Sequence, residues 1–82
     1  MAVAQDNRLW ARKMDSIFNL SPRERECLMW LSVGLRAQEV SEKLGTSYRT
    51  VEKQIASARK KLGANTNEQA VAKALTLGLI SL

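Results

Sequence analysis

Residues 41–62 read SEKLGTSYRTVEKQIASARKKL, and the expected architecture follows from their pattern. In it, a short helical pattern meets a longer one across Gly45, which lies four residues after Ser41 and six before Val51. A turn of this kind needs a residue that can adopt a positive φ, as glycine does without steric cost. The spacing predicts a helix-turn-helix whose second helix covers about residues 48–62.

The second helix of this motif has two chemically different faces. On a helical wheel, its apolar side chains fall within one narrow arc and the opposite arc is mostly basic. The apolar arc holds Val51, Ile55, Ala58 and Leu62, and the opposite arc holds Arg49, Lys53, Ala56 and Lys60. We therefore expect one face to pack and the other to be exposed. Ser47 precedes the helix as an N-cap, beside first-turn amides that suit an anion such as phosphate.

The positive charge of the chain is concentrated on this helix. The 82 residues carry a formal charge of +5, and residues 48–62 hold five Lys or Arg against one Glu, which accounts for +4. Such a local excess indicates a polyanionic partner, and the small, Ala-rich apolar face favours nucleic acid over a membrane. The sequence shows no apolar run near the roughly 20 residues of a membrane span and no signal-peptide core. We expect a cytoplasmic protein with no membrane partner.

The residue types that carry catalysis or bind metals are scarce. The sequence contains no histidine and one cysteine, and it shows no paired carboxylates, nucleophile-base set or phosphate-cradling glycine loop. Cys27 occupies an apolar helical position without a CxxC partner, which favours a core residue over a reactive thiol. We predict no enzyme, no cofactor, no metal site and no small-molecule ligand within this chain.

Three further helices are predicted around the motif. Ser21, Pro22 and Glu24 form a capping box that opens a helix running to about Val33. Residues 37–44 form the first helix of the motif, in which the small Ser41 lets the second helix approach. After Gly63, a last helix begins at Thr66 or Asn67 and extends to about residue 79. Its small residues on several faces suggest a two-fold dimer contact, the alternative being a helix that is simply rich in good helix formers.

The first 19 residues allow two interpretations. Trp10, Met14 and Ile17 are spaced to share one face of a short helix over about residues 6–18. This helix could cover the core, or the segment could be the remnant of a linker from a larger protein.

The chain resembles the LuxR-type helix-turn-helix domain of bacterial transcription regulators. The likeness covers about residues 20–80 and rests on LSPRERECL, Gly34, EVSEKLGTSYRTVEKQI, KKLG and AVAKALTLGLI, which occur in this order. Trp30 and residues 20–34 look most like the quorum-sensing branch. The resemblance implies an all-α fold with a four-helix LuxR/GerE-like domain in residues 20–82. Residues 1–19 are then an added N-terminal helical segment or linker remnant.

The resemblance also implies how such a domain acts. It would dimerise through its C-terminal helix, with Val71, Ala72, Leu75 and Leu79 as the expected interface. Its helix 48–62 would enter the major groove of a two-fold operator in double-stranded DNA. Bases would be read from the positions of Glu52, Lys53 and Ala56, and phosphates held from those of Ser47, Arg49, Thr50, Gln54 and Lys61. RNA polymerase is a further partner to consider.

Side-chain chemistry limits what this helix can read. Lys53 can donate to guanine, Glu52 can accept from N4 of cytosine, and Ala56 offers only a methyl contact. The side chains better suited to phosphates are Arg49, Thr50, Gln54, Arg59, Lys60 and Lys61. The chain departs from the family pattern at Glu52, where a basic residue is usual, at Gln54, where histidine is common, and at Arg36, where Ser or Thr usually caps.

Three functions remain open on the sequence alone. The leading hypothesis is a sequence-specific DNA-binding transcription regulator. The second is a sensor-less modulator that pairs with a full-length regulator through its C-terminal helix. A sigma-factor-type domain shares the motif and ranks third, since residues 20–34 and 67–80 fit it less well.

Overall fold

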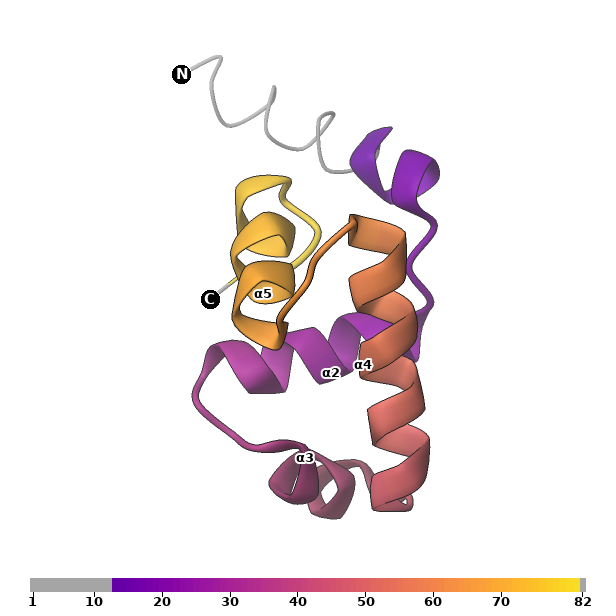
Figure 1. The fold of residues 1–82 in the computed structure, drawn as a ribbon, viewed down its shortest axis with the longest axis vertical. Helices are drawn as coiled ribbons and strands as arrows, with labels where there is room; N and C mark the ends of the chain where they lie inside the picture. Colours follow the sequence, from indigo (N-terminus) through magenta and orange to yellow (C-terminus); the bar gives the residue numbers. More distant parts are fainter. Residues whose placement is uncertain (1–12, 82) are drawn as a thin grey trace.

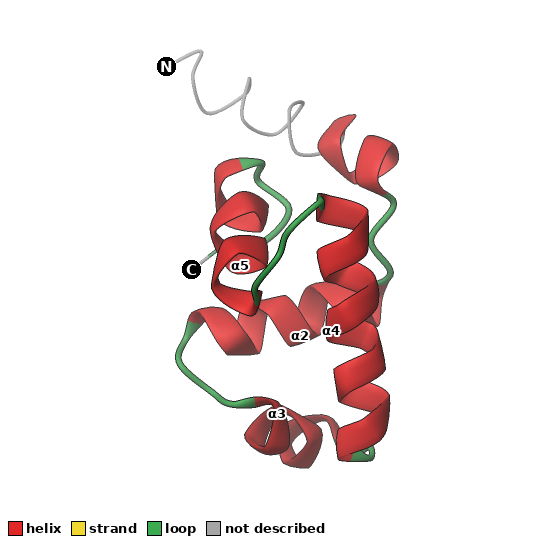
Figure 2. Ribbon diagram, in the orientation of Figure 1, coloured by secondary structure: helices red, strands yellow, loops and turns green. Residues whose placement is uncertain are grey.

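The computed structural model describes residues 13–81, and every regular element in that range is a helix. The helices are α2 (Pro22–Ser32), α3 (Ala37–Leu44), α4 (Tyr48–Leu62) and α5 (Asn67–Thr76), preceded by helical residues 13–18. Figures 1 and 2 show α4 crossing α2, with α3 at one end of α4 and α5 beside its other end. The predicted all-α class, including an N-terminal helical segment, is confirmed. No helix in the described range is long and apolar enough to cross a membrane.

The helix starts reflect local side-chain chemistry. Ser21 and Glu24 form the predicted capping box, in which each side chain accepts a hydrogen bond from the other residue's backbone amide. Thr66 caps α5 by accepting from the Gln69 amide at 3.0 Å. Arg36 occupies the cap position of α3, where the Glu39 carboxylate accepts from its backbone N–H at 2.9 Å.

The corner between α3 and α4 has the predicted geometry. Gly45 ends α3 with φ of 65°, a left-handed conformation that costs other L-residues energy. The Thr46 amide donates to the Ser41 carbonyl at 3.1 Å and closes the turn. Ser41 itself is 5% exposed, and its hydroxyl donates to the Gln38 carbonyl at 2.6 Å, so this small side chain is on the packed side of α3.

Two hydrophobic clusters form the core, and α4 contributes to both. One joins the N-terminal segment, α2, α4 and α5; it contains Met14, Leu20, Leu28, Ala58, Leu62, Ala70, Ala74, Leu79 and Ile80. The other joins α2, α3 and α4 and contains Cys27, Val40, Val51 and Ile55. Cys27 is completely buried, and burial raises the pKa of its thiol, in keeping with the predicted core role.

Two expected placements need correction. Met14 is buried, but Ile17 is 61% exposed and Phe18 packs against the core in its stead. Trp10, the third member of that expected face, lies outside the described residues. Leu79, expected on the dimer surface, is 3% exposed and belongs to the core. The physical reason is that α5 ends at Thr76 and Gly78, with φ of 74°, turns the chain back so that Leu79 points inward.

Candidate nucleic-acid interface

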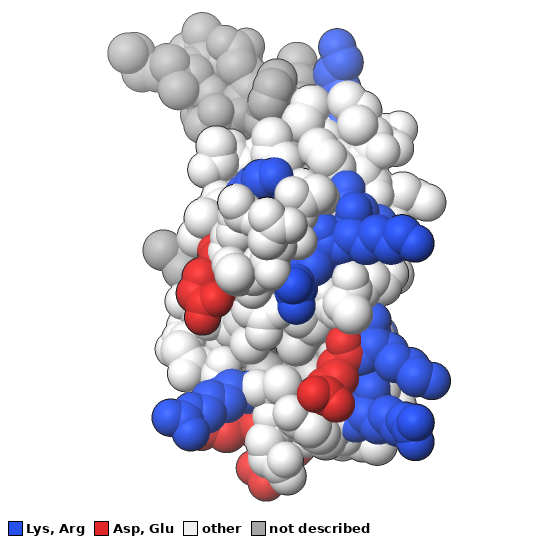
Figure 3. Space-filling view, in the orientation of Figure 1, with Lys and Arg blue, Asp and Glu red and all other residues white. Residues whose placement is uncertain are grey.

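The two predicted faces of α4 are present in the structure. Val51, Ile55, Ala58 and Leu62 are at most 4% exposed, whereas Arg49, Glu52, Lys53, Ala56 and Lys60 are all exposed. Figure 3 shows Lys and Arg side chains gathered along the edge of the molecule where α4 runs. The buried face holds the helix in place while the basic face is presented to solvent.

The N-terminus of α4 lies at one end of the basic face and begins with a side-chain cap. The Ser47 hydroxyl oxygen accepts a hydrogen bond from the Thr50 amide at 3.1 Å, and its own O–H donates to the Thr50 hydroxyl at 2.8 Å. Ser47 therefore is the predicted N-cap. Ser47 and Thr50 are both exposed, next to the positive end of the helix dipole.

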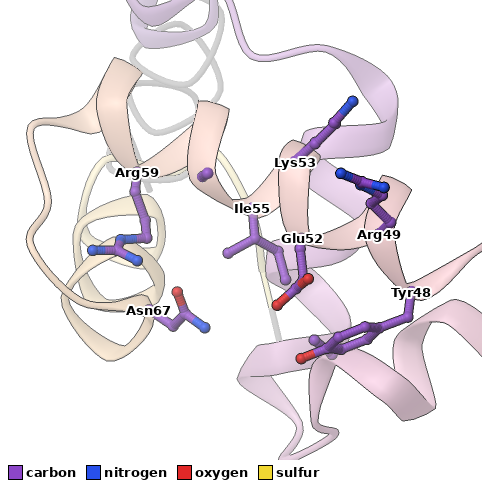
Figure 4. A pocket seen from close by; sticks show the side chains of 9 residues that line it. Tyr48, Arg49, Glu52, Lys53, Ile55, Arg59 and Asn67 are labelled. Atoms are coloured by element: carbon purple, nitrogen blue, oxygen red, sulfur yellow. The ribbon is translucent and has the colours of Figure 1, made fainter.

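A hollow of about 510 Å³ lies along the outer side of α4, between that helix and the starts of α3 and α5. Its lining includes all three predicted base-reading residues, Glu52, Lys53 and Ala56. In Figure 4, the Glu52 carboxylate extends toward Tyr48, whereas Arg49 and Lys53 extend to the other side, so the negative and positive groups in this part of α4 are directed apart. The full lining is Ala37, Tyr48, Arg49, Glu52, Lys53, Ile55, Ala56, Arg59 and Asn67.

Arg59 lies at the far end of the hollow. Its Nη2 donates to the carbonyl oxygen of Asn65 in the α4–α5 connection, and its Nε is buried without a hydrogen-bond partner in the described chain. Asn67, the first residue of α5, also lines the hollow (Figure 4). The contact to Asn65 fixes the guanidinium where α4, the connection and α5 meet.

Lys61 and Gln54, both predicted to hold phosphate, lie on the flank of α4 that packs toward α2. The Lys61 ammonium donates to the Glu24 carboxylate at 2.8 Å and to the Asn19 carbonyl at 2.9 Å. The Gln54 side-chain oxygen accepts from the Cys27 thiol at 3.4 Å. The structure does not bring these two side chains to the hollow, and it uses both to join α4 to the rest of the fold.

Glu24 explains why Lys61 is held in this way. Its side chain is almost fully buried at the first turn of α2. Burial alone would raise the pKa of this carboxyl, but hydrogen bonds from Lys61, Ser57 and the Ser21 amide, together with the Lys61 charge, lower it below its ordinary value. The carboxylate is therefore charged at neutral pH, and the Lys61 ammonium beside it offsets the cost of burying that charge.

Sequence reasoning missed three residues that line the hollow, namely Ala37, Tyr48 and Asn67. Ala37 and Asn67 come from α3 and α5, and no periodicity within α4 could have identified them. Tyr48 carried a signal: it precedes Glu52 by four residues, so the two side chains share one face of α4. The Glu52 carboxylate disfavours the phenolate and so raises the pKa of the Tyr48 phenol.

Comparison with known proteins identifies one family. Residues 18–74 match the bacterial regulatory proteins of the luxR family. The chain is 49% identical over 63 residues to the HTH-type quorum sensing-dependent transcriptional regulator RpaR of Rhodopseudomonas palustris, covering 77% of this chain and 26% of that protein. It is 39% identical over 70 residues to the transcriptional activator protein LuxR of Aliivibrio fischeri, and the match covers 85% of this chain and 27% of that protein.

A solved structure shares the fold as well. The crystal structure of the phage VqmA–DPO complex matches with a TM-score of 0.73 and 28% identity, over 99% of this chain and 38% of that one. The chain spans about a quarter of the length of the curated relatives named above.

Proposed function

The chain belongs to the luxR family of bacterial regulatory proteins, and from this premise we propose that it binds a two-fold operator as a homodimer with α4 in the major groove. It is a LuxR-type DNA-binding domain of a transcription regulator and not an enzyme. The observation that carries the proposal is the division of α4 into a fully buried apolar face and an exposed basic one. A helix anchored in this way can enter a groove without losing its packing.

We assign base reading to Lys53, Glu52 and Ala56. Lys53 can donate to O6 or N7 of guanine, and Glu52 can accept from an exocyclic amine such as N4 of cytosine. Ala56 can contact the methyl group of thymine. All three are exposed and line the same hollow, which supports their acting on neighbouring base pairs.

Phosphate binding falls to side chains around these readers. Arg49 and Lys60 are exposed on α4, and beside its N-terminus the Ser47 hydroxyl donates to that of Thr50, which keeps its own hydrogen to donate to a phosphate. Arg59 has a guanidinium fixed by the Asn65 carbonyl at the other end of the hollow. Lys61 and Gln54 are weaker candidates because their side chains contact Glu24 and Cys27 of α2 and do not line the hollow. Contacts of this kind position the protein without selecting sequence.

The proposed dimer contact is the exposed side of α5. Val71, Ala72 and Leu75 line an open hollow of about 560 Å³ together with Leu31 and Leu35, so residues 13–81 leave this apolar surface uncovered. Two copies joined there would engage two half-sites about one helical turn apart, and the linked binding would exceed that of one copy. A regulator of this kind acts in the cytoplasm, with RNA polymerase as a further partner.

Fluorescence anisotropy with labelled duplex DNA over a salt series tests the proposal. If α4 binds DNA, log K should fall linearly with log salt, by about 0.9 per neutralised phosphate. A duplex with two inverted half-sites should bind more tightly than one with a single half-site. Undetectable binding to any duplex, beside tight binding to a full-length regulator, would instead support the modulator hypothesis.

A further inference from the structure

The apolar hollow beside α5 is bordered by two charges of opposite sign. Arg36 lines it from the residue before α3, and Glu68 lines it from the first turn of α5. In the described part of the chain they are the only charged residues of its lining, and both are exposed. No ion pair formed among residues 13–81 includes either of them. The rim of this surface therefore carries one unpaired charge of each sign.

The charge of Arg36 is not used to start the helix that it precedes. Arg36 occupies the cap position of α3, but its side chain makes no capping hydrogen bond, and Glu39 accepts only from its backbone N–H. The cap residues of the other labelled helices each accept a hydrogen bond with a side-chain oxygen, and these are Ser21, Ser47 and Thr66. The Arg36 guanidinium is therefore available for a contact beyond its own turn.

Glu68 belongs to the face of α5 that borders the hollow. This face, the α5 stripe, consists of residues spaced three, one and three positions apart, so they lie along one side of the helix. Its members are Glu68, Val71, Ala72 and Leu75, and all four line the hollow. The α5 stripe thus begins with a carboxylate and continues with apolar side chains.

The other wall of the hollow has the complementary chemistry. It is formed by the end of α2 and the connection to α3, where Leu31 and Leu35 are apolar and Arg36 is basic. Figure 1 shows α5 lying over α2, and the two helices are in contact. The α5 stripe of a second copy, laid on this wall, would pack apolar side chains together and bring a carboxylate to the guanidinium. In a two-fold contact this happens twice, since each copy supplies one stripe and one wall.

We propose that Arg36 and Glu68 form reciprocal ion pairs across a two-fold contact between copies of this chain, and that these pairs select the partner. The inference rests on the proposed dimer and names the side chains that make it specific. Exposed ion pairs add little affinity, whereas like charges brought together are costly. The pairs therefore act on which partner binds, and in which register, more than on how tightly it binds.

Exchange of the two charges tests this pairing in the full chain. Arg36→Glu and Glu68→Arg each place two like-charge contacts in the homodimer, and each should weaken self-association roughly ten- to a hundredfold. Mixing the two variants should restore association, because both contacts of the mixed dimer join opposite charges again. Sedimentation equilibrium measures the dissociation constants, and native mass spectrometry identifies the mixed dimer.

The matched control moves the same charge change away from the hollow. Glu42 is exposed on α3 and does not line the hollow, so Glu42→Arg alters the net charge as Glu68→Arg does. Glu42→Arg should self-associate as wild type does, and mixed with Arg36→Glu it should show no preference for the mixed dimer. The neutral variants Arg36→Gln and Glu68→Gln should weaken association less than the reversals do. Thermal unfolding checks that each variant is folded.

The outcomes separate this inference from the proposed function. If wild type dimerises and either charge reversal leaves its dissociation constant unchanged, the ion pair does not contribute and the inference is wrong. If both reversals weaken association and only the double variant in one chain restores it, the charges interact within one copy, which also overturns the inference. Either result leaves operator binding by the dimer standing.

A comparison on DNA covers the case in which free self-association is too weak to measure. The same variants are then compared through the gain in affinity that a second half-site provides, a ratio from which direct effects on DNA contact cancel. If wild type neither self-associates nor gains affinity from a second half-site, the proposed dimer fails and this inference fails with it. Binding to a single half-site still reports whether α4 binds DNA.

Discussion

At the scale of single residues, the exposed face of α4 separates base reading from phosphate binding. Lys53→Ala removes the proposed donor to guanine and leaves the buried face untouched. We expect it to lower affinity for the preferred operator by about 1–3 kcal/mol and affinity for unrelated duplex far less. Competition binding with both duplexes at fixed salt measures the ratio. Equal losses on the two duplexes would assign Lys53 to the phosphates instead.

Arg49→Ala is the counterpart on the same face. Arg49 lies near the N-terminus of α4 and is exposed, so we assign it to the DNA backbone. The variant should weaken binding to all duplexes by a similar factor and reduce the slope of log K against log salt by about 1. The salt series with operator and random duplex provides both numbers. A loss confined to one operator sequence would contradict this assignment.

The Glu24–Lys61 pair predicts how stability depends on pH. Because folding lowers the pKa of the Glu24 carboxyl, the stabilisation is fully present above its unfolded-state pKa and is lost as pH falls through the folded one. Glu24→Gln should therefore cost about 1–3 kcal/mol of unfolding free energy at pH 7 and much less at pH 3. Urea unfolding at the two pH values measures the difference.

A control for that experiment lies on the same helix. Glu26 pairs with Arg23 at 3.7 Å on the surface, and such pairs contribute little. Glu26→Gln should change stability only slightly at either pH. If Glu24→Gln were equally costly at pH 7 and pH 3, its effect would come from packing rather than from the charge.

The same pair shows where residue-level prediction from sequence ended. The exposed positions of α4 were predictable because a helical wheel separates them from Val51 and Ile55. The ion pair of Lys61 was not predictable, because Glu24 is 37 residues away in the sequence. The two side chains meet only because α2 crosses α4. The contact of Gln54 with Cys27 could not be predicted for the same reason, since Cys27 also lies on α2.

At the scale of helices, the sequence predicts starts better than ends. The caps at Ser21, Ser47 and Thr66 depend on contacts within three residues; the first two were predicted, and Thr66 was one of two candidates for the third. The last helix was expected to reach about residue 79 but ends at Thr76. Tertiary packing determines the path of the chain after Thr76, because Leu79 and Ile80 fold back into the core formed by α2, α4 and α5. Ile17 was expected on the same face as Met14, yet Phe18 packs against the core and Ile17 is exposed. Which of the two neighbours is buried depends on the assembled core and not on the local spacing.

The turn between α3 and α4 allows a direct test at this scale. Gly45 has φ of 65°, and a Cβ added there would meet nothing within 4 Å. Gly45→Ala should therefore cost about 1–2 kcal/mol from backbone strain alone, without any steric clash. Chemical unfolding measures this cost. Gly45→Asn is the matched variant and should cost less, because asparagine adopts the left-handed conformation more readily. Equal costs for the two would point to a lost contact instead of strain.

At the scale of the whole molecule, α4 is held at both ends by different clusters. Val51 and Ile55 pack with α2 and α3, and Ala58 and Leu62 pack with α2 and α5. The helices α4 and α5 share one hydrophobic cluster. This cluster therefore connects the basic face of α4 rigidly to the surface of α5 that we propose for dimerisation. Two copies joined through α5 would fix the direction of both reading helices, as binding to a two-fold operator requires.

Ala72 provides the test of this assembly. It is exposed on α5 and lines hollows on two sides of that helix, so it lies where a second copy would pack closely. Ala72→Glu should place a charge in the contact and prevent dimerisation, while Ala72→Ser keeps a small side chain and should not. Linked half-sites typically raise affinity by about 10²–10⁴. Ala72→Glu should lose most of this gain on a duplex with two half-sites yet bind a single half-site as wild type does. Analytical sedimentation measures the oligomeric state, and anisotropy measures the affinity for each duplex. An equal loss of affinity on the two duplexes would show that Ala72 affects DNA contact or folding and not assembly.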